Sequence, residues 1–201
     1  NCRFTGWQDT IFNGDPMTCN MKKLMLPDFF QASEVPIVHK FYRNYFKDCY
    51  VCGDVDYIFG PNAAFFDHCE IHSIARVSEG KAYITAASTP AGQEFGLVFS
   101  HCRITGEEPD SVYLGRPWRD CAKTAFICCE LGDHICPEGW PNWGKVPAEV
   151  LSDYIEYGNF GPGADCSGRS PLSRCLVNPE VETYFSKENV LVGEDGWIPA
   201  E

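Results

Sequence analysis

The chain has 201 residues, a formal net charge of −12 and a hydrophobic fraction of 44%. Its length and composition predict one folded domain with a hydrophobic core rather than a disordered chain. The acidic charge argues against binding to nucleic acid or to an anionic membrane surface. The sequence shows no apolar run long enough to span a bilayer and no signal peptide. Because it opens at Asn1 within a strand-like run, we expect a fragment or a processed product.

Strand-like segments recur in chain order. They are rich in β-branched and aromatic residues, and Gly and Pro separate them. They lie at residues 2–6, 55–60, 63–72, 82–89, 96–105, 111–116 and 124–131. Residues 13–37 interrupt this pattern and predict a long insertion loop. Residues 147–158 suggest one or two helical turns, and residues 158–201 an irregular tail. All 201 residues are predicted to form a single domain.

A cysteine repeat accompanies the strands. Cys, any residue and then an apolar residue recur at Cys2, Cys49, Cys69, Cys102 and Cys129. Residues two apart in a strand point to the same side, so one such strand per turn describes a solenoid of parallel strands with stacked side chains. Free cysteine packs as a small hydrophobe, and we therefore predict a ladder of mostly free, buried thiols.

The other cysteines are less informative. The pairing of five of them stays open: Cys19, Cys121, Cys136, Cys166 and Cys175. Cys49 and Cys52 have no partner pair at a zinc-like spacing, so the sequence predicts no metal site. His68 and His101 each precede a ladder cysteine and are expected to point outward, and no histidine is expected to be catalytic.

Three polar clusters lie at strand ends: residues 8–9, residues 54–60 and residues 114–119. Each alone is compatible with a solvated turn or a strand cap. Asp9 and Asp56, however, follow their ladder cysteines by the same seven residues. In a parallel solenoid this register places the two carboxylates on neighbouring rungs. Like charges so close raise the proton affinity of one of them, which divides the roles of acid and nucleophile. Arg116 is the candidate that would keep its partner ionised.

Five segments carry a resemblance to a known family. "GWQDT", "GDVDYIFG", "YLGRPWR", "HICPEGWPNW" and "EYGNFGPGA" resemble, in order, signature segments of the pectin methylesterases, which remove methyl esters from pectin. The resemblance runs from about Phe4 to Ala164, and "YITAAST" looks closer to the bacterial branch. It implies an all-β fold, a right-handed parallel β-helix whose N-terminal coils are missing here.

The resemblance also implies roles. Asp56 matches the nucleophile and Asp9 the acid that protonates methanol and then activates water. Gln8 matches an oxyanion-stabilising amide, and Arg116 the residue that orients the nucleophile. Two aromatic residues match the lining of the sugar cleft: Trp118 and Phe59. The implied partner is methyl-esterified homogalacturonan, acted on by a secreted or periplasmic enzyme, a monomer when full-length, with no cofactor and no metal.

Two departures and two alternatives accompany this interpretation. Family members carry a second oxyanion glutamine on the preceding rung, and this chain begins after it, as it begins after the usual end cap. Activity of these 201 residues alone is therefore expected to be strongly reduced, with aggregation or dimerisation through the open end.

The alternatives are a non-catalytic pectin-binding module and a calcium-dependent lyase, for which Asp54 and Asp56 would be the nearest carboxylate cluster.

Overall fold

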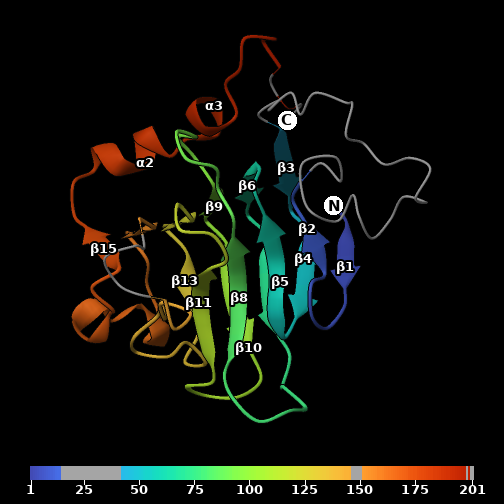
Figure 1. Cartoon of the computed structure of the whole chain (residues 1–201), viewed down its shortest axis with the longest axis vertical. Coiled ribbons are helices and arrows are strands. Elements are labelled where there is room, and N and C mark those ends of the chain that lie inside the picture. The colour runs from blue at the N-terminus through green and yellow to red at the C-terminus, as the bar shows by residue number, and fades with distance from the viewer. Residues whose placement is uncertain (15–41, 146–150, 198, 200–201) are drawn as a thin grey trace.

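The computed structural model describes residues 1–14, 42–145, 151–197 and 199. Three parallel sheets make up the fold (Figure 1). The first contains β1 (Arg3–Thr5), β4 (Tyr50–Gly53), β7 (Glu70–Ser73), β10 (Arg103–Gly106) and β13 (Glu130–Leu131). The second contains β2 (Ile11–Phe12), β5 (Val55–Gly60), β8 (Ala82–Ala87) and β11 (Val112–Pro117). The third contains β3 (Arg43–Lys47), β6 (Ala63–Asp67), β9 (Leu97–Ser100), β12 (Lys123–Ile127), β14 (Asp153–Tyr157) and β15 (Ser173–Leu176).

As far as β13 the chain visits the three sheets in turn and then repeats, and the last two strands, β14 and β15, both join the third sheet. Thus β1 pairs with β4, β2 with β5 and β3 with β6, all in parallel. Crossovers between parallel strands of one sheet are right-handed almost without exception. The molecule is a right-handed parallel β-helix: the cysteine repeat predicted a solenoid of parallel strands, and the family resemblance implied its handedness.

Phenylalanine rings stack up the interior of this β-helix. Phe46, Phe66, Phe99 and Phe126 come from β3, β6, β9 and β12, and consecutive ring centroids lie 4.5, 4.7 and 4.5 Å apart with nearly parallel planes. These centroid separations match the spacing of neighbouring strands, so each of these four coils adds one stacked phenylalanine to the hydrophobic core.

The cysteine ladder is confirmed beside this stack. The thiols of Cys49, Cys69, Cys102 and Cys129 are buried and free. The Sγ atoms of Cys69, Cys102 and Cys129 each approach the carbonyl oxygen of the phenylalanine one coil earlier at 3.3–3.4 Å. The preceding residues all have left-handed φ angles: Asp48, His68, His101 and Cys128. This conformation turns the chain sharply between the third sheet and the first.

Cys2 differs from the other rungs. It lies next to β1 in the predicted register, one residue before the pair Arg3–Tyr50, yet it is exposed. The expectation of burial was wrong because β1 is the outermost described strand of its sheet. Among the open cysteines, Cys166 and Cys175 form a disulfide, whereas Cys121 and Cys136 are free. Cys19 lies outside the described residues.

Two predictions about the C-terminal half require correction. Residues 153–157, expected to be helical, form strand β14, which pairs with β12 on one side and β15 on the other. Both faces of this strand are covered: Tyr154 stacks on Trp140 inside, and Ile155 packs outside. Because both faces of the strand are buried, its sequence lacks the alternation of polar and apolar residues by which a strand is predicted.

The predicted insertion at residues 13–37 lies outside the described residues except for positions 13 and 14, and residues 146–150 also lie outside them.

The tail is also more ordered than expected. Beyond β15 it forms α2 (Glu180–Tyr184) and α3 (Lys187–Val190). Val181 and Val190 from these helices join Phe65, Val98 and other outward-facing side chains of the third sheet in a second hydrophobic cluster. The two helices therefore pack on part of the outer face of the third sheet, and Figure 1 shows them at the upper left of the molecule. Within the described residues, no helix is long and apolar enough to cross a membrane.

Candidate active site

Asp56 lies in a β-bulge of strand β5. Val55 pairs with Tyr83 and Ile58 with Thr85, so two residues of β5 face a single residue of β8. Asp56 adopts a left-handed φ of 51° there, and its residue is only 6% exposed. Bulges redirect a side chain out of the regular alternation and are frequent beside active sites. The bulge is therefore the local reason that a carboxylate is held at this strand.

Asp9 occupies the equivalent place one coil earlier. Its amide donates a hydrogen bond to the Val55 carbonyl oxygen at 3.1 Å, and the register two residues later pairs Ile11 with Ile58. Asp9 has a φ of 59°, so both aspartates share the left-handed conformation. Asp9 and Asp56 therefore occupy equivalent positions on neighbouring coils, as their common seven-residue distance from a ladder cysteine predicted. Asp9 is exposed, whereas Asp56 is buried.

Arg116 binds Asp56 with two parallel hydrogen bonds. Its Nε donates to Oδ1 at 2.9 Å and its Nη2 to Oδ2 at 2.7 Å. Arg116 belongs to β11, which is two strands from β5, a backbone separation of about 10 Å. Only a long side chain covers that distance, and the planar guanidinium matches both carboxylate oxygens. The predicted pairing is therefore present in the structure.

Both carboxyl groups have a pKa above the ordinary value. Burial raises the pKa of Asp56, and the hydrogen bonds and charge of Arg116 offset this rise only in part. Partial desolvation and the neighbouring charge of Asp56 raise the pKa of Asp9, which Arg116 lowers through its charge alone. The two guanidinium hydrogen bonds favour the ionised form of Asp56, so Asp9 is the better candidate to hold a proton.

Aromatic rings lie around the Arg116 guanidinium and near the ends of β5 and β11. Phe59 and Trp118, the two predicted cleft aromatics, meet edge to face with centroids 5.8 Å apart. Arg116 lies between the rings of Tyr83 and Trp143, with its Cζ 3.8 and 3.6 Å from their centroids. The sequence argument missed these last two residues as parts of the site. Trp143 lies in the quoted "HICPEGWPNW" segment, and that clustering of tryptophans was the available signal.

A buried network supports the loop that carries Trp143. Trp140 is fully buried, and its indole nitrogen donates to Glu156 Oε1 at 2.9 Å. Arg169 donates to both oxygens of Glu156 at 2.8 and 3.0 Å. Gly115, next to Arg116, leaves no room for a side chain, because a Cβ would lie 1.9 Å from Thr85 Oγ1 and 3.0 Å from the Trp140 ring. Glu156, the first residue of the "EYGNFGPGA" segment, is thus connected to the strand that bears Arg116 through Trp140.

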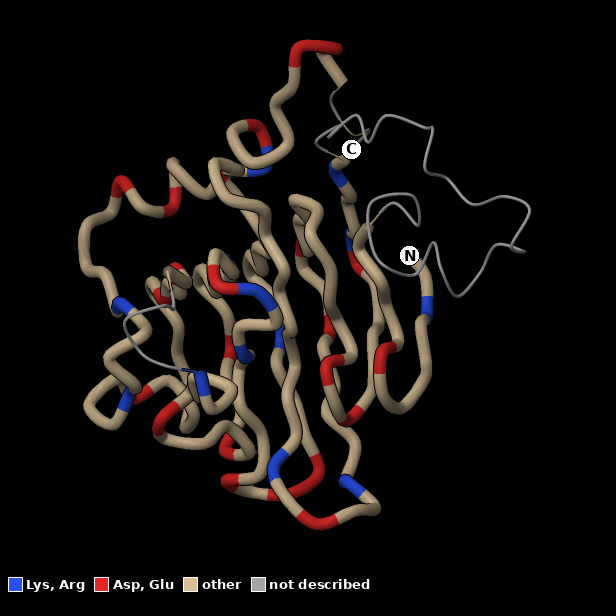
Figure 2. The backbone as a smooth tube through the Cα atoms, in the orientation of Figure 1, with Lys and Arg blue, Asp and Glu red and all other residues tan. Residues whose placement is uncertain are grey.

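Gln8 lies exposed in the turn directly before Asp9. The adjoining Trp7 is 57% exposed, and its carbonyl oxygen accepts a hydrogen bond from the Asp54 amide. Many Asp and Glu positions lie in the turns at the ends of the strands (Figure 2), so the net negative charge is spread around the β-helix.

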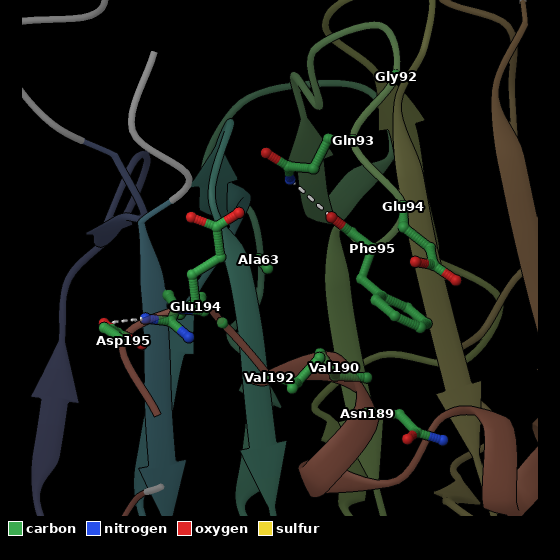
Figure 3. A pocket seen from close by; sticks show the side chains of 12 residues that line it. Ala63, Gly92, Gln93, Glu94, Phe95, Asn189, Val190, Val192, Glu194 and Asp195 are labelled. Atoms are coloured by element: carbon green, nitrogen blue, oxygen red, sulfur yellow. Dashed lines mark hydrogen bonds and ion pairs between the residues drawn. The ribbon is translucent and has the colours of Figure 1, made fainter. Parts of the chain in front are cut away.

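A separate hollow of about 770 Å³ lies between the turn at residues 92–95 and the C-terminal segment at residues 189–195. Figure 3 shows Phe95 and Val190 lining it, with the Gln93 amide bonded to the Phe95 carbonyl. None of the six predicted site residues lines this hollow. The carboxylate pair is therefore on a different part of the surface.

The fold and the site together define a class: parallel β-helix proteins with paired aspartates beside an arginine. Residues 31–194 match the Pectinesterase family. Pectinesterase 31 of Arabidopsis thaliana is 36% identical over 182 residues, which cover 90% of this chain and 48% of that protein. Probable pectinesterase A of Aspergillus fumigatus is 36% identical over 180 residues, which cover 86% of this chain and 45% of that protein.

Solved structures agree. The pectin methylesterase from carrot has a TM-score of 0.72 at 26% identity and covers 94% of this chain and 55% of that one. A pectin methylesterase in complex with a hexasaccharide has a TM-score of 0.68 at 25% identity, covering 98% of this chain and 57% of that one. The chain belongs to the pectinesterase family. It spans about half the length of these relatives, and its placement in a bacterial branch stays a prediction.

Proposed function

We propose that this chain carries the catalytic centre of an esterase that hydrolyses methyl esters of polygalacturonate. The observation that carries the proposal is the pairing of Asp56 with Arg116 while Asp9 lies one rung away. A carboxylate is a weak nucleophile and needs a fixed geometry, and two guanidinium hydrogen bonds supply it. Membership of the pectinesterase family identifies the ester, and the hexasaccharide bound by a structural relative fits an extended sugar chain as ligand.

The proposed reaction has two steps. The Asp56 carboxylate attacks the ester carbonyl carbon, and the resulting oxyanion accepts a hydrogen bond from the Gln8 amide. Collapse breaks the bond to the methoxy oxygen, which takes the proton of Asp9 and leaves as methanol. The acyl group is then an anhydride with Asp56. Asp9, now ionised, removes a proton from water as that water attacks the acyl carbon, and Asp56 is released as carboxylate.

The aromatic residues suggest how the polymer is held. Phe59 and Trp118 form an edge-to-face pair beside the strand that bears Asp56, and Trp143 covers Arg116. Flat apolar rings of this kind suit the apolar faces of sugar rings. We infer that methyl-esterified homogalacturonan is bound along the second sheet, by a protein that is a monomer at full length and acts outside the cell or in the periplasm.

The test is methanol release from methylated pectin by the chain and by Asp56→Asn. The variant should lose methanol release and keep its affinity for oligogalacturonides, because only the nucleophile changes. Asp54→Asn is the matched control: it lies two residues away, and its Oδ1 accepts from the amide of Val55. It should retain activity. Methanol release that is measurable and equal in the chain and in Asp56→Asn would refute the assignment. Saccharide affinity without any methanol release by the chain would favour a binding module or an inactive fragment.

The calcium-dependent lyase is disfavoured by one observation. Both carboxylate oxygens of Asp56 accept hydrogen bonds from Arg116, so Asp56 is committed to a cation already present in the chain. Asp54 uses its Oδ1 for a backbone amide. Methanol release should therefore be unchanged by EDTA, and calcium-dependent cleavage of the polymer without methanol release would support the lyase instead.

A further inference from the structure

A cluster of metal-binding side chains lies on the outer side of the β-helix, away from the carboxylate pair. His101 occupies the left-handed turn between β9 and β10, and Cys128 occupies the equivalent turn between β12 and β13, with φ angles of 53° each. The two turns are neighbours because β9 and β12 pair in parallel. Glu182 reaches the same place from helix α2. Three residues distant in sequence thus converge from three elements.

The ligand atoms of these residues lie close enough to share one ion. A ring nitrogen of His101, the Cys128 Sγ and a Glu182 carboxylate oxygen are all within 4.8 Å of one another. The His101 Nε2 and the Glu182 Oε1 are 3.7 Å apart. Tetrahedral zinc with bond lengths of about 2.0–2.3 Å places its ligand atoms roughly 3.3–3.8 Å apart. Small rotations of exposed side chains close that difference. Imidazole, thiolate and carboxylate are all common zinc ligands.

The histidine is oriented for this role. Its Nδ1 lies 3.0 Å from the Ser100 hydroxyl, which leaves Nε2 directed toward Glu182. The ring also stacks on His68 of the previous coil, with centroids 5.2 Å apart and an interplanar angle of 8°. Metal-binding histidines characteristically make such a hydrogen bond through the other nitrogen, which fixes the tautomer and the ring.

The third ligand is held by packing. Val181, next to Glu182, is buried in the hydrophobic cluster on the third sheet, and Phe185 meets Phe95 edge to face at 5.8 Å. This packing fixes where Glu182 leaves the helix, beside the turns that carry His101 and Cys128.

We propose that His101, Cys128 and Glu182 bind one zinc ion, with water as the fourth ligand, and that the ion ties helix α2 to the turns of the β-helix. The sequence predicted no metal site because the three ligands are scattered along the chain and show no zinc-like spacing. The site is independent of the proposed esterase activity, since it shares no residue with the carboxylate pair.

The experiment uses the full chain, stripped of metal with EDTA and kept reduced. Zinc chloride is titrated by calorimetry, and cobalt(II) is titrated in parallel to detect a thiolate-to-cobalt charge-transfer band. We expect one equivalent to bind, with a rise in Tm on adding zinc. Cys128→Ser should abolish the band. Ser100→Ala, which removes only the hydrogen bond to the histidine, should weaken binding by about 10- to 100-fold.

Matched variants guard against misfolding and other thiols. Cys121→Ser changes another half-buried free cysteine and should leave binding unchanged. Glu182→Gln alters an exposed side chain on α2 and should weaken zinc binding without changing the Tm of the metal-free chain. No stoichiometric binding, a cobalt band that survives Cys128→Ser, or loss of binding in Cys121→Ser would each overturn the proposal.

Discussion

Replacement of Arg116 by glutamine probes the centre of the proposed site. The side chains of Arg116 and Asp56 are only 18% and 9% exposed, so the change leaves a buried carboxylate without its partner. Breaking such a pair costs about 3–5 kcal/mol. That is a large part of the roughly 5–15 kcal/mol by which domains are stable.

The cost should depend on pH in a defined direction. In the native chain burial already raises the pKa of Asp56, and Arg116 lowers it. Without Arg116 the pKa rises further. When the pKa of a carboxyl group is higher in the folded than in the unfolded state, the free energy of unfolding decreases as the pH rises through the folded-state pKa. At lower pH the group is protonated in the folded state, and this loss of stability disappears. Arg116→Gln should therefore lose more stability at pH 8 than at pH 5.

Urea unfolding at the two pH values measures this difference, and methanol release against pH measures its consequence. Because only ionised Asp56 can attack, the acid limb of the rate profile should move to higher pH in Arg116→Gln. Arg119→Gln is the control, since Arg119 is exposed and lies over the ring of Trp118, whereas Arg116 is the arginine that is hydrogen-bonded to Asp56. Adding Asp56→Asn to Arg116→Gln should restore part of the stability. An equal loss at both pH values together with an unmoved acid limb would refute the reasoning.

Three further predictions concern single residues. Gln8→Ala should lower kcat by about 100- to 1,000-fold without changing the urea midpoint, because Gln8 is exposed; unchanged methanol release would remove it from the oxyanion site. Gly115→Ala should lower the urea midpoint and methanol release together, since its Cβ would overlap a hydroxyl of the neighbouring strand; a stable, active variant would contradict this. Arg169→Met removes the cation beside the buried Glu156, to which Trp140 still donates one hydrogen bond, and should cost about 3–5 kcal/mol in urea unfolding. Arg174→Met, which breaks an exposed pair, should cost at most about 1 kcal/mol. Equal losses for these two variants would show that burial does not set the cost.

Periodic side chains made the fold predictable from the sequence. The cysteine at one place per coil, the alternating aromatic residues and the Gly-bounded strands depend only on the two-residue repeat of a strand and on stacking between coils. The same register placed Asp9 beside Asp56. Strand β14 escaped this argument because both of its faces are covered, one by Trp140 and the other by the second hydrophobic cluster, so its sequence does not alternate.

Contacts between distant segments were decided only by the tertiary structure. Three such contacts join residues that no local sequence pattern relates. Arg116 lies between the rings of Tyr83 and Trp143. Trp140 donates a hydrogen bond to Glu156, and His101 lies near Cys128 and Glu182. Periodicity fixes which side of a strand a residue faces and which rung it occupies. It does not fix where a loop or a terminal helix returns, because that depends on the packing of whole surfaces against one another.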